Sequence, residues 1–359
     1  MTEAEAYVAF NMTDRIGPVA VARLAEEHGS VSAAWSALGK KVSRSGGEVD
    51  WEGEFRKAAK YGVRLLTLAD DEFPARLRGV PGSPSVLYVR GSVEALSAPA
   101  VALIGTRRAT SRGRDAANRL AYDLAKSGWA IVSGLALGID AAGHRGALDA
   151  GGVTVGVIGS ALDEFYPEAN RPLAREIIEK GGAVVSQFPF GRPPDRETFP
   201  IRNHVVAALA AGVVAVEAPA RSGTLITVGA AADLGRPVMA MPGRVDDRMS
   251  AGCLSLIRDG ATLVRNADDV IEELSDLFPG MRRASVAAET PARDEDAPAY
   301  SAQEAIVMLH VDDDGVSVDD LPGLTGLTPA EVTSVVMTLR VKGFVRFLPG
   351  NRIAMPLRH

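Results

Sequence analysis

The sequence predicts an α/β protein whose largest part is a mostly parallel, doubly wound sheet. Between residues 101 and 264, short apolar runs alternate with amphipathic stretches long enough to form helices. Each run is continuously apolar, which is the pattern of a strand covered by helices on both faces. Hydrophobic residues make up 47% of the chain, enough to bury a sizeable core. The expected strands are 101–105, 129–133, 154–158, 183–186, 213–216, 237–241 and 261–264.

Residues 1–70 precede this sheet and are expected to form a helical domain. Their apolar residues recur at helical spacing, interrupted at Ile16-Gly17-Pro18 and again at 28–30. The first interruption is similar to the turn of a helix-hairpin-helix (SAM-like) module, whose backbone amides can hold a DNA phosphate. Because it contains a single glycine, a plain helical turn is favoured over a helix-hairpin-helix.

The C-terminal part of the chain reads as a linker followed by a small module. Residues 284–299 contain two prolines and no bulky apolar periodicity, which favours a linker. A helix over 302–310, a helix from Thr328 to about Lys342 and a hairpin over 344–353 predict a winged helix. The expected domains are therefore 1–70, 71–283 and 300–359, with the linker at 284–299.

Composition limits the kinds of function that are expected. The formal net charge of −6 argues against a protein that coats nucleic acid non-specifically, so a polyanion site must be a local patch. The single cysteine, Cys253, cannot form an intramolecular disulfide and is a poor metal ligand by itself. An acidic N-terminus and short apolar stretches predict a cytoplasmic protein without membrane insertion. No cofactor or metal is expected.

Small residues and arginines follow the predicted strands, at the edge where α/β sheets bind ligands. Their backbone N–H groups, a helix N-terminus and fixed positive charge suit a phosphate. For the arginines, the alternative is an ordinary solvated helix start; Ser222 and Thr224 are also expected to cap a helix. The candidate phosphate-binding residues are Gly105, Thr106, Arg107, Arg108, Ser133, Gly134, Arg202, Asn203, His204, Ser222, Gly223 and Thr224.

Aromatic and titratable side chains add further candidates at this edge. Phe165 and Tyr166 follow the third predicted strand and either stack on bases or pin their loop, with Phe165 expected to be the exposed one. Asp140 and His144, four residues apart on one helix face, form either an acid–base couple or a mutually satisfied structural pair. The structural pair is favoured because no nucleophile or metal cluster completes a catalytic set. Glu217 is either a base or a structural acceptor.

The chain carries neither a dinucleotide-binding glycine fingerprint nor a P-loop lysine. It resembles the DprA/Smf family of DNA-processing proteins through motifs at 105–107, 133–144, 166–170, 199–203, 217–218, 222–227, 235–238 and 242–243. The resemblance implies a Rossmann-like domain that binds single-stranded DNA, forms a homodimer and delivers DNA to the RecA recombinase during natural transformation, without enzymatic activity. The family usually has arginine where this chain has His204, which concerns the expected binding face directly.

Two other functions compete with this one. A phosphoribohydrolase-like nucleotide-processing enzyme would use a Pro-Gly-Gly phosphate loop and a downstream glutamate, whereas here Glu217 precedes Ser222. A regulator that binds double-stranded DNA through the C-terminal module is disfavoured by the acidic residues at 312–314 and 319–320.

Overall fold

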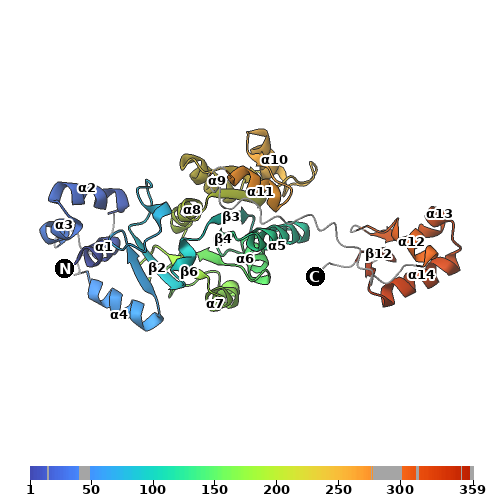
Figure 1. Cartoon of the computed structure of the whole chain (residues 1–359), viewed down its shortest axis with the longest axis horizontal. Coiled ribbons are helices and arrows are strands. Elements are labelled where there is room, and N and C mark those ends of the chain that lie inside the picture. The colour runs from blue at the N-terminus through green and yellow to red at the C-terminus, as the bar shows by residue number, and fades with distance from the viewer. Residues whose placement is uncertain are drawn as a thin grey trace. The chain divides into compact units, whose positions relative to one another are not determined.

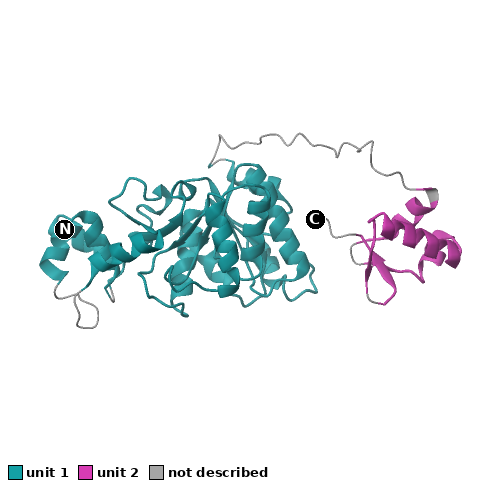
Figure 2. Ribbon diagram, turned by 90° about the horizontal axis from the view of Figure 1, so that it is seen from below, with its two compact units in different colours: residues 1–284 teal, residues 285–359 magenta. Residues whose placement is uncertain are grey.

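The computed structural model describes residues 1–13, 16–39, 49–275, 277, 301–312, 315–348 and 350–355. The chain forms two compact units, residues 1–284 and 285–359 (Figure 2). The expected N-terminal helical domain and the sheet domain thus belong to one compact unit. The expected linker at 284–299 lies outside the described residues.

The N-terminal segment is helical, as predicted, and its helix boundaries follow from local capping. The helices are α1 (Glu3–Asn11), α2 (Pro18–His28), α3 (Val31–Leu38) and α4 (Trp51–Tyr61). Thr2 and Glu5 form a capping box at the start of α1, and Asp50 accepts a hydrogen bond from the Gly53 N–H at the start of α4. Helix α2 begins with Pro18 and is followed by Gly29, which has a positive φ of 84°.

The described residues contain a nine-stranded sheet with the order β1-β2-β6-β5-β4-β3-β7-β8-β9. Figure 1 labels β2, β6, β4 and β3 of this sheet. All seven predicted strands are found to within a few residues, and they pair in parallel. Two antiparallel strands, β1 and β2, extend the sheet beyond β6, so the expectation that helices continue to residue 70 is wrong at 64–67. The strands are β1 (Arg64–Thr67), β2 (Val86–Gly91), β3 (Ala100–Gly105), β4 (Ala130–Ser133), β5 (Thr154–Val157), β6 (Ala183–Ser186), β7 (Gly212–Glu217), β8 (Val238–Ala240) and β9 (Thr262–Leu263).

Helices cover both faces of the sheet, which confirms the doubly wound prediction. On one face, Val205 and Leu209 of α8 and Val228 of α9 pack in the same core as the strand residues Val132 and Val213. On the other face, helices α5, α6 and α11 pack against Val101 and Ile131. The helices are α5 (Ser111–Lys126), α6 (Ile139–Asp149), α7 (Arg171–Glu179), α8 (Thr198–Leu209), α9 (Thr224–Asp233), α10 (Ala251–Arg258) and α11 (Ala267–Leu274), with short 3-10 helices at Ala75–Leu77, Glu94–Leu96 and Glu168–Asn170.

The second unit is a winged helix, as predicted. Helices α12 (Ala302–Met308), α13 (Leu321–Thr325) and α14 (Pro329–Val341) pack beside the small antiparallel sheet β10-β12-β11. Its strands are β10 (Val316–Ser317), β11 (Arg346–Leu348) and β12 (Arg352–Ala354). Capping boxes begin α12 and α14, at Ser301 and Thr328. Over the described part of the chain, we find no helix with the length and apolar character needed to cross a bilayer.

Candidate functional site

A small pocket lies at the carboxyl edge of the parallel strands. The loops after β3, β4 and β5 meet there with the first turns of α8, because neighbouring parallel strands end at the same edge. The pocket brings together side chains that lie up to 95 residues apart in the sequence. Its lining residues are Arg107, Gly134, Ala136, Leu137, Tyr166, Pro167, Phe199 and Arg202.

Glu217, the last residue of the neighbouring strand β7, holds the loop after β3 in place by hydrogen bonds. The backbone carbonyl of Glu217 accepts a hydrogen bond from Thr106 N–H at 2.8 Å, and its carboxylate accepts bonds from Thr110 N–H at 2.8 Å and Thr110 Oγ1 at 2.7 Å. Thr110 in turn caps α5 by accepting from Gly113 N–H. Glu217 is 5% exposed, and these contacts favour the structural acceptor of the two roles expected for it.

Arg107 projects from this loop over the pocket. Its side chain is exposed, and its guanidinium carbon lies 4.8 Å from the centre of the Phe199 ring. Arg108 is also exposed, while its N–H donates to Thr106 Oγ1 at 3.2 Å. Of the two arginines, only Arg107 lines the pocket. The structure thus places one accessible cation directly against an aromatic face of the site.

Arg202 is a second cation in the pocket lining. It is 4% exposed and so is buried. Its Nη1 donates to the carbonyl oxygens of Gly134 and, at 2.7 Å, of Val157, which ties the ends of β4 and β5 to α8. A Cβ atom at Gly134 would overlap the Arg202 guanidinium, which would then have to shift from its present position. Burial lowers the pKa of Arg202 to about 10, Arg107 adds to the lowering, and Asp140 opposes it. Arg202 therefore remains charged at neutral pH.

Asp140 and His144 do not pair with each other, so the favoured expectation of a mutually satisfied pair is wrong. Asp140 Oδ2 accepts a hydrogen bond from Ala136 N–H at 3.2 Å, and burial raises the pKa of this carboxyl despite the nearby Arg202. His144 Nδ1 lies 2.7 Å from Thr154 Oγ1 and is fully buried. The two residues share a helix face, but Asp140 contacts the loop after β4 and His144 contacts β5, which neither spacing nor residue type reveals.

The serine and threonine candidates make internal contacts. Ser133 is fully buried and its hydroxyl donates to Leu103 O at 2.5 Å. At the start of α9, Gly223 occupies the N-cap position, and Ser222 Oγ accepts from Thr224 N–H at 3.2 Å. Because Gly223 is the N-cap residue and no described side chain caps α9, the expectation that Ser222 and Thr224 cap this helix is wrong, and neither residue lines the pocket.

The aromatic residue exposed at the pocket is Tyr166, so the expectation for Phe165 is wrong. Tyr166 is 45% exposed, and its ring lies 6.1 Å from that of Phe199. Phe165 is half-buried against the core around α7 and lies under Arg171, whose guanidinium carbon is 5.2 Å from the ring centre. Phe199 was not among the sequence candidates, although its position three residues before Arg202 on one helix face was a usable signal.

Asn203 and His204 are not part of the pocket lining. His204 follows Arg202 by two residues, a rotation of about 200° around the helix, so it faces away from the pocket. A Cβ atom at Gly82 would lie 3.5 Å from His204 Nε2, which places this imidazole beside the loop before β2. The expected contact between His204 and a phosphate is therefore not supported by the geometry.

Comparisons with known proteins agree on one family. Residues 64–275 match the family described as DNA recombination-mediator protein A, and residues 289–351 match the DprA winged helix domain. A putative DNA processing protein DprA from Mycobacterium tuberculosis is 36% identical over 81% of this chain and 77% of its own length. Protein Smf from Synechocystis is 29% identical over 98% of both chains.

Solved structures give the same result. DNA processing protein A from Streptococcus pneumoniae is similar with a TM-score of 0.65 and 32% identity, covering 76% of this chain and 98% of that one. DNA processing protein A from Helicobacter pylori, whose structure describes a single-stranded DNA binding mode, gives 0.53 and 31%, covering 59% and 96%. By sequence match and by fold, this chain belongs to the DprA family of DNA-processing, recombination-mediator proteins.

Proposed function

We propose that this chain binds single-stranded DNA in the pocket at the carboxyl edge of the sheet, and passes the strand to RecA during natural transformation. The observation that carries the proposal is the meeting of Arg107 and Arg202 with Tyr166 and Phe199 in one small pocket. Guanidinium groups attract phosphates, and aromatic rings stack on bases of any sequence. The Helicobacter pylori relative, described as binding single-stranded DNA, supports this choice of ligand.

The geometry favours a single strand over a duplex. To contact the rings of Tyr166 and Phe199, a base must leave its neighbours, and this costs less in a flexible single strand than in a stacked, paired duplex. Arg107 already lies 4.8 Å from the Phe199 ring centre, so a phosphate held by Arg107 would bring its own base close to that ring. The chain as a whole carries a net charge of −6 and repels DNA, so we expect DNA to bind only at a locally positive site such as this pocket.

A non-enzymatic mediator fits the buried groups of the site better than a nucleotide hydrolase. Hydrolysis of a glycosidic bond needs an accessible carboxyl group as acid, base or nucleophile. Asp140 and Glu217 are 7% and 5% exposed, and both accept hydrogen bonds from backbone N–H groups. His144 is fully buried, and burial lowers its pKa to about 3.

A binding titration tests this function. Fluorescence anisotropy with labelled oligo-dT, and with duplex of equal length, should show a strong preference for the single strand. The logarithm of the affinity should fall with the logarithm of salt concentration by roughly 0.7 per phosphate neutralised. Arg107→Ala should lower both affinity and slope, while Arg119→Ala, an exposed arginine farther along α5, should change neither. Unchanged binding by Arg107→Ala would overturn the assignment of the pocket.

The partners in the proposal have separate tests. Delivery to RecA predicts that the wild-type chain speeds formation of RecA filaments on single strands coated by a single-strand-binding protein, and that Arg107→Ala does so less. Homodimer formation predicts a concentration-dependent change from one chain to two in sedimentation velocity. Filament formation unaffected by the wild-type chain would remove the RecA step while leaving DNA binding intact.

A further inference from the structure

We propose that Glu54, in the N-terminal helix α4, is a positioning residue for the pocket. It acts through residues 187–192, here called the strap, which follow β6 and hold both the loop of Tyr166 and the start of α8. The proposal rests on the proposed function only for its DNA-binding consequence. The physical coupling from α4 to the pocket can be measured without DNA.

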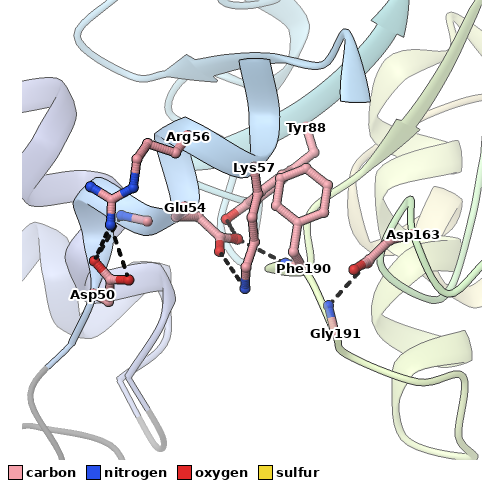
Figure 3. Close-up of polar contacts among 9 residues, drawn as sticks. Asp50, Glu54, Arg56, Lys57, Tyr88, Asp163, Phe190 and Gly191 are labelled. Atoms are coloured by element: carbon pink, nitrogen blue, oxygen red, sulfur yellow. Dashed lines mark hydrogen bonds and ion pairs between the residues drawn. The ribbon is translucent and has the colours of Figure 1, made fainter. Parts of the chain in front are cut away.

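Glu54 reaches out of the N-terminal helices into the sheet domain (Figure 3). Its side chain is 1% exposed, and Oε1 accepts hydrogen bonds from Phe190 N–H at 2.7 Å and from Tyr88 Oη at 2.9 Å. Lys57 Nζ lies 4.0 Å from Oε2. Asn11 of α1 donates to Gln187 O at 3.1 Å. The N-terminal helices therefore hold the strap at two of its backbone groups, the Gln187 carbonyl and the Phe190 N–H.

The ring of Phe190 completes this attachment. Its centre lies 5.4 Å from that of Tyr88 in an edge-to-face arrangement, and 5.5 Å from that of Tyr61. The side chain is 6% exposed, so the backbone N–H that Glu54 accepts belongs to a residue packed in the core. Movement of the strap would have to break this packing and the hydrogen bond together.

From the strap, one set of contacts leads to Tyr166. Gly191 N–H donates to Asp163 Oδ1 at 3.0 Å, a contact drawn in Figure 3. Arg192 O accepts from Ala161 N–H at 2.9 Å. Both partners lie in the loop after β5, and Asp163 precedes Tyr166 by three residues. The strap thus sets the position of the loop that presents this aromatic ring to the pocket.

A second set of contacts leads to Phe199. The Arg192 guanidinium pairs with Asp195 at 2.6 Å. Asp195 Oδ1 accepts from the N–H groups of Glu197 and Thr198, each at 2.8 Å, and so orders the first turn of α8. Phe199 follows directly. The two aromatic side chains of the pocket are therefore both fixed through the strap, and the strap is fixed through Glu54.

The chemistry of Glu54 favours a positioning role over simple core packing. Burial raises the pKa of the Glu54 carboxyl, and the nearby Asp163 adds to this effect. The hydrogen bonds from the Phe190 N–H and the Tyr88 hydroxyl, and the charge of Lys57, lower this pKa but do not cancel the increase. An apolar residue at this position would avoid the desolvation of a carboxylate, but it could not accept the Phe190 N–H. What the carboxylate provides is a fixed location for the strap.

Two measurements on matched variants test the proposal. Glu54→Ala removes the acceptor, Glu54→Gln keeps an oxygen for Phe190 N–H, and Glu52→Ala removes an exposed carboxylate of the same helix that pairs only at the surface with Arg56. Hydrogen exchange without DNA should quicken in Glu54→Ala at 159–170 and 187–199, and remain unchanged at β3 and β4. Glu54→Gln should restore most of the protection, and Glu52→Ala should match the wild type.

Oligo-dT binding provides the second readout. Glu54→Ala should weaken it about tenfold, the scale of one hydrogen bond to a charged group, and Glu54→Gln should recover most of the loss. The proposal is overturned if Glu54→Ala lowers stability without faster exchange in the two segments, or if Glu54→Gln behaves like Glu54→Ala. If Glu54→Ala does not fold, hydrogen exchange at 187–199 is compared between Glu54→Gln and Asn11→Ala. Faster exchange in Asn11→Ala than in Glu54→Gln supports the proposal, and exchange in Asn11→Ala as slow as in the wild type overturns it. Faster exchange without any wild-type DNA binding would instead reject the proposed function.

Discussion

Replacement of His144 by asparagine should make the first unit less sensitive to acid. His144 is fully buried under the pocket, and Thr154 Oγ1 donates to Ile131 O at 2.7 Å, so the imidazole Nδ1 must be the protonated nitrogen that donates to Thr154. Burial, together with the nearby Arg202, lowers the pKa of His144 to about 3. An asparagine amide can reach the position of Nδ1 and does not titrate.

The size of the expected pH effect on the free energy of unfolding follows from the linkage between proton binding and folding. A histidine whose folded pKa is depressed adds stability that is fully present above its unfolded pKa and is lost as pH falls towards the folded pKa. For His144 the window runs from about 6.5 down to about 3. At pH 5 the folded imidazole is still neutral, so the loss comes from its protonation in the unfolded chain. Between pH 7 and pH 5 the wild type should lose about 2 kcal/mol through His144.

The assay is urea unfolding at pH 7, 6 and 5 at fixed ionic strength, followed by tryptophan fluorescence. All three tryptophans, Trp35, Trp51 and Trp129, lie in residues 1–284, so the signal reports the first unit alone. His144→Asn will be less stable at pH 7 because of the lost ring volume. The quantity that matters is the change with pH, in which other titrating groups cancel between the two proteins. Equal losses between pH 7 and pH 5 would refute a neutral, buried His144.

Three further outcomes test the description of the site. Phe199→Ala should weaken oligo-dT binding by about 1–3 kcal/mol while leaving the salt slope unchanged, because it removes stacking and no charge; anisotropy at several salt concentrations measures both, and a reduced slope would contradict the stacking role. A chain ending at residue 284 should keep oligo-dT affinity within a few-fold, since the pocket belongs wholly to the first unit, and loss of binding by a truncated chain with native circular dichroism would contradict this. His204→Arg should show the same dependence of binding on pH between 8 and 6 as the wild type, because His204 faces Gly82; tighter binding by the variant at neutral pH would place this position at the DNA after all.

The sequence by itself determined the parallel sheet and the winged helix. A strand covered on both faces must be apolar at every position, so the seven parallel strands are marked locally, as in Ala183–Ser186. Helix starts are equally local: Thr328 and Glu331 form a capping box whose partners are three residues apart. The motif residues at the strand ends also followed from the chain alone, because parallel strands must end at one edge.

Tertiary structure decided which of those residues share a surface. Strand β1 pairs with β2, and β2 pairs with β6 across almost a hundred residues, a choice that no local pattern records. Tyr166 rather than Phe165 faces the pocket, because the core around α7 accepts the phenylalanine. The contacts of Glu54 with Tyr88 and Phe190 join residues 34 and 136 positions apart. Period and capping act over a few residues, whereas side-chain partners depend on which elements pack together, and this is settled only when the whole unit folds.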